Sequence, residues 1–275
     1  MSRNSINTIQ KFKQNNEKFA TLTAYDYTSA KLLDRAEIPL ILVGDSASMV
    51  MYGYDTTIPV SMDEMLLVTS AVVRGTSKAL IVADMPFMSY QTSIEQALEN
   101  AGKFIKNAGA GAVKLEGGVE VCKIISSIIK IGIPVVGHIG LKPQSFHQTS
   151  GYKIQGKSLN DAEQIIADAI AVQEAGAFAV VLEGIPAELA QKISNLVSIP
   201  TIGIGAGPHC DGQIQVFHDI LGLFDTFIPK HTKRFADIGN DISKAVKQYK
   251  EDVISGVFPT KEHCISIDKD IIEKL

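Results

Sequence analysis

The stretch Leu40-Ile-Leu-Val-Gly-Asp-Ser46 gives the first indication of the fold. Its four apolar residues predict a short buried strand, which a glycine ends, and a carboxylate (Asp45) and a hydroxyl (Ser46) follow at once. A charged residue at the end of a buried strand is costly unless it binds something. The same arrangement recurs in Leu80-Ile-Val-Ala-Asp84 and in Ala112-Val-Lys-Leu-Glu116. The sequence therefore predicts three buried strands that each end in an acid.

Composition limits the class of protein. The chain has 275 residues, of which 45% are hydrophobic and 20% charged, and its formal net charge of -4 gives no general attraction to nucleic acid. Three widely spaced cysteines show neither metal-ligand spacing nor a disulfide framework, which favours a reducing compartment. The N-terminus lacks the apolar core of a signal peptide, and no apolar run approaches the roughly 20 residues of a membrane span. We expect a cytoplasmic protein without nucleic-acid or membrane partners.

Short apolar strands alternate with amphipathic helices along the chain. The expected strands cover residues 19–25, 40–43, 79–83, 112–115, 134–137, 179–182 and 200–204, with an eighth in 213–222. The expected helices cover residues 5–16, 29–36, 61–74, 93–108, 120–131, 160–175, 186–197 and 241–256, with long loops at 47–59 and 140–157. This alternation predicts a parallel sheet whose faces are covered by helices.

Two closures of such a sheet are open, a (β/α)8 TIM barrel and an open doubly wound sheet. The segment Thr23-Ala-Tyr-Asp26 after the first strand contains no glycine, so the dinucleotide-binding fingerprint is absent. Functional-looking residues also end nearly every strand, which is where barrels place their active sites. We therefore favour the barrel, as a single domain over residues 1–275 with a C-terminal tail, 264–275, to which we assign no role.

Asp45, Asp84 and Glu116 follow or end three successive strands, so in a barrel they converge on one rim. Carboxylates this close raise one another's pKa unless a cation lies between them. Mg²⁺ takes one or two carboxylates together with water and substrate oxygens, so we expect these residues to form a magnesium site. The alternative is that the acids cap helices or pair with lysines.

Lys114 lies two residues before Glu116 on the same strand, so both side chains point to the same side. A lysine inside a barrel needs a partner for its ammonium group. It could bind a substrate carboxylate beside the metal, form a Schiff base with a carbonyl, or serve only in a salt bridge. The nearby acids favour the first, because they hold the lysine protonated.

Glu183 ends the sixth strand, across the barrel from the three acids. Its apolar neighbours Leu182 and Ile185 could raise the carboxyl pKa toward neutral, which makes Glu183 the best candidate for a general base. Capping the next helix is the alternative. We expect His138, at the end of the fifth strand, to be a hydrogen-bonding residue of the site wall. The stretch Gly203–Gly207 is similar to a phosphate-binding loop, but a tight turn at the barrel rim explains it equally well.

Many ordered motifs of the chain are similar to those of one family. They are Thr23-Ala-Tyr-Asp-Tyr27, Val43-Gly-Asp-Ser46, Ala83-Asp-Met-Pro-Phe87, Val113-Lys-Leu-Glu-Gly-Gly118, Gly137-His-Ile-Gly-Leu141 with Pro143-Gln144, Gly151-Tyr-Lys-Ile-Gln-Gly156, Gly203-Ile-Gly-Ala-Gly207 with Asp211-Gly-Gln213, Ile228-Pro-Lys230 and Gly256-Val-Phe-Pro259. Over about residues 5–263 the chain thus resembles the ketopantoate hydroxymethyltransferase family, which acts on the route to pantothenate and coenzyme A.

The resemblance implies a barrel of the phosphoenolpyruvate/pyruvate type, one Mg²⁺ per subunit, and 5,10-methylenetetrahydrofolate as the one-carbon donor to 3-methyl-2-oxobutanoate. It implies that Asp45, Asp84 and Glu116 serve the metal. It also implies that Asp45, Ser46, Asp84 and Lys114 hold the keto acid, and that Glu183 accepts the proton from C3. A homodecamer is implied as the assembly. This chain departs from the family at Ala47-Ser48, where Leu-Gly is frequent, and at Gly184, where some members have cysteine.

Three other functions are compatible with such a site. A Mg²⁺-dependent lyase or mutase of the same barrel type would also act through an enolate. A metal-free aldolase would form a Schiff base on Lys114. A barrel that binds a ligand without catalysis would be expected to lack the acids at the rim, and this chain has all of them.

Overall fold

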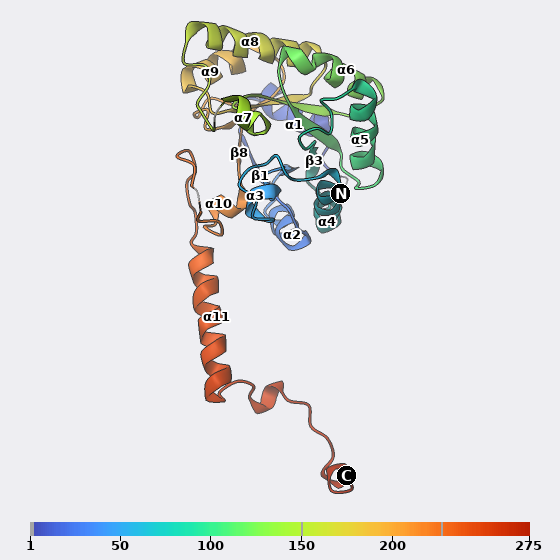
Figure 1. The fold of residues 1–275 in the computed structure, drawn as a ribbon, viewed down its shortest axis with the longest axis vertical. Helices are drawn as coiled ribbons and strands as arrows, with labels where there is room; N and C mark the ends of the chain where they lie inside the picture. The colour runs from blue at the N-terminus through green and yellow to red at the C-terminus, as the bar shows by residue number, and fades with distance from the viewer. Residues whose placement is uncertain (1–2, 150, 227) are drawn as a thin grey trace. The chain divides into compact units, whose positions relative to one another are not determined.

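The apolar runs of the sequence form eight short parallel strands that close into a barrel in the order β1 to β8. Figure 1 shows this computed structural model, which describes residues 3–149, 151–226 and 228–275. The strands are β1 (Phe19–Thr23), β2 (Leu40–Val43), β3 (Leu80–Asp84), β4 (Ala112–Glu116), β5 (Val135–Gly140), β6 (Ala179–Glu183), β7 (Thr201–Ile204) and β8 (Gly212–Gln215). The prediction of a (β/α)8 TIM barrel is confirmed.

Helices follow most of the strands and cover the barrel from outside (Figure 1). All helices of the described residues, those of the C-terminal segment included, are α1 (Ile6–Gln14), α2 (Tyr27–Arg35), α3 (Ala47–Val50), α4 (Met62–Gly75), α5 (Ile94–Lys106), α6 (Cys122–Lys130), α7 (Phe146–Thr149), α8 (Leu159–Glu174), α9 (Ala187–Leu196), α10 (Phe217–Ile220), α11 (Ile238–Ser255) and α12 (Lys269–Ile272). Short 3-10 helices cover Val119–Val121, Pro143–Ser145 and Lys261–His263. Ser61 caps α4, because its side chain accepts from the Glu64 backbone while the Glu64 side chain accepts from the Ser61 backbone N–H.

Three local predictions were wrong. The loop expected at 47–59 begins with the short helix α3, and the hydroxyl of Ser48 donates to the carbonyl of Thr56 at 2.6 Å, which ties the loop to that helix. The loop expected at 140–157 contains a 3-10 helix that starts at Pro143, a residue suited to a first helical position, and then α7. Strand β5 continues to Gly140 because its ladder to β6 extends that far, so His138 lies within the strand instead of ending it.

The described residues divide into two compact units, and each is described by itself. The first comprises residues 1–217 with 228–232 and contains the barrel, and the second comprises 218–227 with 233–275. In the second unit, helix α11 is present as predicted, and none of its residues is buried. The assignment of a single domain stays a prediction. Among the helices that the structure describes, none has both the length and the apolar character needed to cross a membrane.

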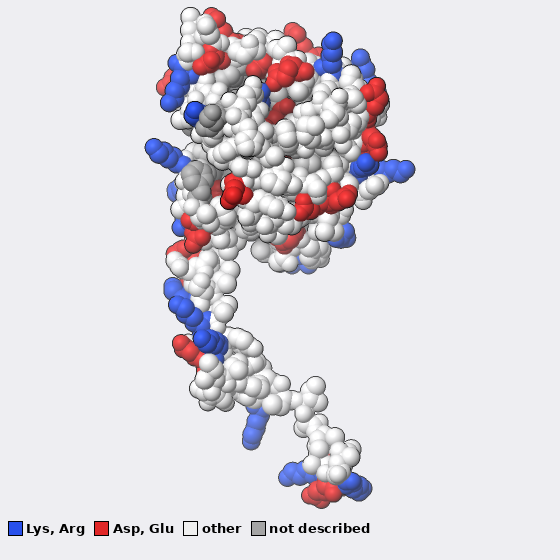
Figure 2. Space-filling view, viewed as in Figure 1, with Lys and Arg blue, Asp and Glu red and all other residues white. Residues whose placement is uncertain are grey.

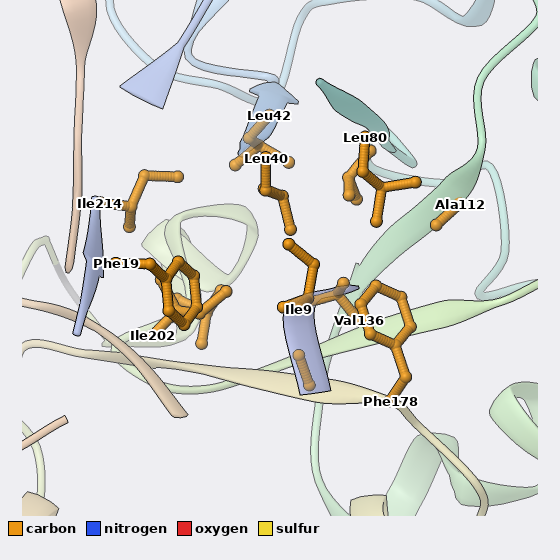
Figure 3. Close-up of a cluster of buried hydrophobic side chains, with 13 residues drawn as sticks. Ile9, Phe19, Leu40, Leu42, Leu80, Ala112, Val136, Phe178, Ile202 and Ile214 are labelled. Atoms are coloured by element: carbon orange, nitrogen blue, oxygen red, sulfur yellow. The ribbon is translucent and has the colours of Figure 1, made fainter. Parts of the chain in front are cut away.

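Apolar side chains fill the amino-terminal half of the barrel interior (Figure 3). Because side chains alternate across a strand, each strand sends every second residue inward. The strand residues of this cluster are all buried: Phe19, Leu40, Leu42, Leu80, Val82, Ala112, Val136, Ala179, Val181, Ile202 and Ile214. Phe178, which directly precedes β6, is also buried in the cluster. Ile9 of α1 joins them and is completely buried, so the first helix closes the bottom of the barrel.

We predict that Ile9→Ala destabilises the protein by about 2–5 kcal/mol, because it leaves a cavity among side chains that cannot collapse around it. Chemical denaturation followed by circular dichroism measures the free energy of unfolding. Ile131→Ala is the matched control, since Ile131 is 53% exposed and its loss should change stability by less than about 0.5 kcal/mol. If the two substitutions lowered the free energy of unfolding equally, the conclusion that α1 closes the bottom of the barrel would be contradicted.

Candidate active site at the carboxyl ends of the strands

The alternation that places apolar residues in the lower barrel places polar ones directly above them. On β3, Asp84 continues the inward row of Leu80 and Val82, and on β4, Lys114 and Glu116 continue the row of Ala112. The strand register pairs Asp84 with Lys114 and Glu116 with His138. Polar and charged residues from five strands or their ends therefore line one small cavity of about 110 Å³. They include Asp45, Ser46, Asp84, Lys114, Glu116, His138 and Glu183.

The end of β2 presents Asp45 and Ser46 to this cavity, as the sequence predicted. Asp45 is only 4% exposed, and its backbone N–H donates to Asp84 Oδ2 at 3.2 Å. The hydroxyl of Ser46 lies 2.8 Å from the hydroxyl of Tyr25, with which it shares a hydrogen bond. These contacts fix the strand end, so the Asp45 carboxylate and the Ser46 hydroxyl keep defined positions.

Lys114 is the cation at the centre of the site. Its Nζ lies 2.8 Å from Asp84 Oδ1 and 4.0 Å from Glu116 Oε1, and it donates to His138 Nδ1 at 3.0 Å. Burial alone would lower the pKa of Lys114, but the charges of Asp84, Glu116 and Asp45 outweigh burial and raise it. The ammonium group therefore stays protonated at any physiological pH.

The buried carboxylates outnumber this one ammonium group. Burial raises the pKa of Asp45, and the neighbouring charge of Asp84 raises it further. Burial likewise raises the pKa of Glu116, with Lys114 acting in the opposite direction. With all of its carboxyls ionised, the site would carry more negative charge than Lys114 neutralises. The raised pKa values of Asp45 and Glu116 therefore favour their protonated forms, and a divalent cation would instead stabilise the ionised forms.

The donor set fits a magnesium ion with few protein ligands. Gln144 holds Asp45 Oδ2 through its Nε2 and Glu116 Oε2 through its backbone N–H, at 2.9 and 3.0 Å. The other oxygen of Glu116, Oε1, is buried and accepts no hydrogen bond from any described residue. Within the described ranges, no group of three or more His, Cys, Asp or Glu side chains is arranged to hold a metal by itself. Mg²⁺ accepts such a site, since it completes its shell with water and substrate oxygens.

Glu183 ends β6 on the wall of the same cavity, and its side chain is 18% exposed. Burial raises its pKa to about 7, while Lys114 and His231 act to lower it. A carboxylate with a pKa near 7 is well matched to proton abstraction at physiological pH. Its neighbour Gly140 has a left-handed φ of +90°, and a Cβ there would lie 2.3 Å from the Glu183 carbonyl oxygen. Only glycine allows this approach.

His138 lies between Lys114 and Glu183. Burial and the charge of Lys114 hold the pKa of His138 well below its usual value, so the ring is neutral. Because Nδ1 accepts from Lys114, the ring proton is on Nε2, which lies 3.2 Å from Glu183 Oε2. The N–H is not aligned for a hydrogen bond, so the contact is an electrostatic one. His138 therefore lines the wall of the cavity beside Glu183.

Two residues of the site were given no role from the sequence. Gln144 and Tyr90 are both buried, and the Tyr90 hydroxyl accepts from the Glu116 backbone N–H at 3.1 Å. Neither is charged and neither lies on a strand, so no periodicity marked them. The glycine-rich loop after β7 is explained by its backbone, because Gly205 and Gly207 both have left-handed φ values, +61° and +75°.

The two long loops of the sequence meet above the site. The hydroxyl of Tyr152 donates to the sulfur of Met49 at 3.7 Å, and the Gln155 backbone N–H donates to the Gly184 carbonyl at 2.9 Å. Tyr152 also packs edge-on against Phe146, with ring centroids 5.1 Å apart. These contacts bring both loops to the mouth of the cavity.

The solved structures that resemble this fold are barrels with little sequence similarity. A 2,3-dimethylmalate lyase, a member of the PEP mutase/isocitrate lyase superfamily, matches with a TM-score of 0.60 and 16% identity, over 100% of this chain and 95% of that one. A phosphonopyruvate hydrolase in complex with oxalate and Mg²⁺ matches with a TM-score of 0.61 and 14% identity, over 98% and 94%. These likenesses confirm the fold.

Sequence comparison gives the family. The family model described as ketopantoate hydroxymethyltransferase matches residues 3–261. The 3-methyl-2-oxobutanoate hydroxymethyltransferase of Dehalococcoides mccartyi (strain CBDB1) is 57% identical over 99% of this chain and 98% of its own length. The enzyme of the same name from Chloroflexus aurantiacus (strain J-10-fl) is 53% identical over 97% and 94%. The chain belongs to the ketopantoate hydroxymethyltransferase family.

Proposed function

We propose that this enzyme transfers a one-carbon unit from 5,10-methylenetetrahydrofolate to 3-methyl-2-oxobutanoate, giving ketopantoate on the route to pantothenate. The observation that carries the proposal is sequence similarity along nearly the full chain to enzymes named 3-methyl-2-oxobutanoate hydroxymethyltransferase, one of which is 57% identical. The site supports it with a buried group of acids, a protonated lysine and a carboxylate whose pKa is near 7.

The residues divide into two groups. Asp45, Asp84 and Glu116 would hold Mg²⁺, which when bound polarises the keto group as a Lewis acid. Ser46 and Lys114 would bind the carboxylate and keto oxygens of the substrate, since both line the cavity and both are hydrogen-bond donors. A cavity of about 110 Å³ suits a small keto acid.

Glu183 would remove the proton from C3 of the keto acid. Negative charge then develops toward the keto oxygen, on the side of the cavity where Lys114 supplies a fixed positive charge. C3 next forms a bond to the methylene carbon of the folate, the carbon–nitrogen bonds of that methylene break, and water supplies the oxygen of the new hydroxymethyl group. The proton taken up by Glu183 returns to solvent or to the departing folate nitrogen.

The folate needs a second space, because the cavity is too small for it. The loops that hold Met49 and Tyr152 lie at the cavity mouth, and we infer that the folate binds against them. On the face shown in Figure 2, acidic and basic side chains of the barrel unit are scattered, without a broad basic patch.

The metal-free aldolase is disfavoured by the state of Lys114. A Schiff base forms from a neutral amine, and the pKa of Lys114 is raised by three acids at close range. A lyase and a phosphomutase of similar fold are 16% and 14% identical to this chain, which supports a shared barrel alone.

We further propose that the protein is cytoplasmic and assembles as a homo-oligomer, with the homodecamer implied by the family as the specific case. Apolar side chains exposed on α11 support an assembly: Ile242, Val246, Tyr249 and Val253 are each at least 45% exposed.

The function is tested directly by product formation. With 3-methyl-2-oxobutanoate, Mg²⁺ and methylenetetrahydrofolate labelled with ¹³C in the methylene group, we expect a new labelled hydroxymethyl signal in the NMR spectrum. Omitting the folate should remove the signal. Cleavage of the keto acid without folate would instead indicate a lyase.

Glu183→Gln should lower the rate at which the C3 proton of 3-methyl-2-oxobutanoate exchanges with deuterated water by at least about 100-fold. Binding of the keto acid, measured by calorimetry, should change little because the amide has the same shape. Glu188→Gln on the exposed start of α9 is the matched control and should exchange normally. Undiminished exchange in Glu183→Gln would remove Glu183 as the base.

The raised pKa of Glu183 also predicts a pH dependence of stability. Its pKa is about 7 in the folded protein and 4.5 ordinarily, so the folded state favours the protonated form. Stability from this group is complete below pH 4.5 and is lost as the pH rises through 7. Relative to wild type, metal-free Glu183→Gln should therefore gain stability over that range, reaching about 3 kcal/mol. If the free energy of unfolding of the two proteins depended on pH in the same way, the raised pKa of Glu183 would be contradicted.

A further inference from the structure

Gln144 follows β5 within the 3-10 helix that begins at Pro143, and its side chain is buried, with 5% exposure for the residue. From there it contacts the ends of three other strands. Its partners are Asp45 after β2, Met85 after β3, and Glu116 at the end of β4. Gln144 is neutral and contacts two of the proposed metal ligands, so it is placed to hold them in position.

Every hydrogen-bonding position of the Gln144 amide is used. Its Nε2 donates to Asp45 Oδ2 and to the Met85 carbonyl, both at 2.9 Å. Its Oε1 accepts from the Tyr90 hydroxyl at 2.8 Å and from Gln91 Nε2 at 3.2 Å. Because the Met85 carbonyl can only accept, the amide nitrogen must face Asp45, so the orientation of the amide is determined.

The backbone of Gln144 holds a second acid. Its N–H donates to Glu116 Oε2 at 3.0 Å, and the Tyr90 hydroxyl, which contacts the Gln144 amide, accepts from the Glu116 backbone N–H. Gln144 therefore binds one oxygen of Asp45 and one oxygen of Glu116. The second oxygen of each carboxylate is left without a contact to Gln144, and in Glu116 it is buried without a hydrogen bond from the described residues.

We propose that Gln144 is a positioning residue that sets Asp45 and Glu116 for a divalent cation, an inference that rests on the proposed function. It holds the two carboxylates through one oxygen each and so decides which oxygens face the cation. Without the amide, the Asp45 carboxylate would lose the contact that holds its Oδ2, and the cation would have to fix this side chain itself. Loss of such a contact typically weakens metal binding by about 10–100-fold.

Mn²⁺ binding provides a readout that is independent of turnover. Free Mn²⁺ is measured by electron paramagnetic resonance in titrations of the full-length wild type, Gln144→Met and Gln155→Met, with 3-methyl-2-oxobutanoate present. Gln144→Met should raise the dissociation constant by about 10–100-fold. Gln155→Met, whose side chain bonds only to the Lys153 carbonyl among the described contacts, should bind like wild type. C3 exchange by Gln144→Met should recover at high Mn²⁺ concentration.

A structural role alone would give a different result. Thermal unfolding of Gln144→Met would then shift while its Mn²⁺ affinity stayed within about twofold of wild type, and that outcome overturns the proposal. If Gln144→Met does not fold, Tyr90→Phe tests the proposal in its place. This substitution keeps the ring but removes the hydroxyl that bonds to both Gln144 and Glu116. Tyr90→Phe should weaken Mn²⁺ binding several-fold, and wild-type affinity in this variant would also overturn the proposal.

Failure of the proposed function gives a separate signature. A wild type that neither binds Mn²⁺ in the presence of keto acid nor forms labelled product would refute the function itself. A wild type that does both, beside a Gln144→Met variant that binds Mn²⁺ equally well, would refute only the role of Gln144.

Discussion

The constraint on which the site depends is the burial of several carboxylates around a single ammonium group. Asp45, Asp84 and Glu116 all lie within the influence of Lys114, and one positive charge cannot compensate them. In water such a cluster would cost little, but in a buried cavity each uncompensated charge is expensive. The raised pKa values of Asp45 and Glu116 show that protonation relieves this repulsion in the protein alone. Under the proposed function a divalent cation would relieve it instead, and this need would link the fold to its proposed chemistry.

The barrel provides the rigidity that this arrangement requires. The same inward rows that carry the acids begin with tightly packed apolar residues, and Ile9 closes them from below (Figure 3). Charged side chains above a rigid floor cannot move apart to relieve their repulsion. The polar network around Gln144 adds a second restraint from the side, so that the carboxylates are held before any ligand arrives.

Much of the fold followed from the sequence, because continuous apolar strands and amphipathic helices carry strong local signals. The positions of Asp84, Lys114 and Glu116 also followed, since residues two apart on a strand share a face. The roles of Gln144 and Tyr90 did not follow, because their contacts join segments far apart in the chain and depend on barrel closure. The short helices within the two loops were missed for a similar reason, as tertiary contacts such as that of Ser48 with Thr56 stabilise them.

The central claim is that this site ionises C3 of a keto acid with the help of a divalent cation. The most direct test is proton NMR of 3-methyl-2-oxobutanoate in deuterated water with the wild-type protein, with Mg²⁺ and then with excess EDTA. The account predicts loss of the C3 proton signal with Mg²⁺, no loss after chelation, and recovery of exchange when Mg²⁺ is restored. Exchange that continues at full rate without any divalent ion would contradict it.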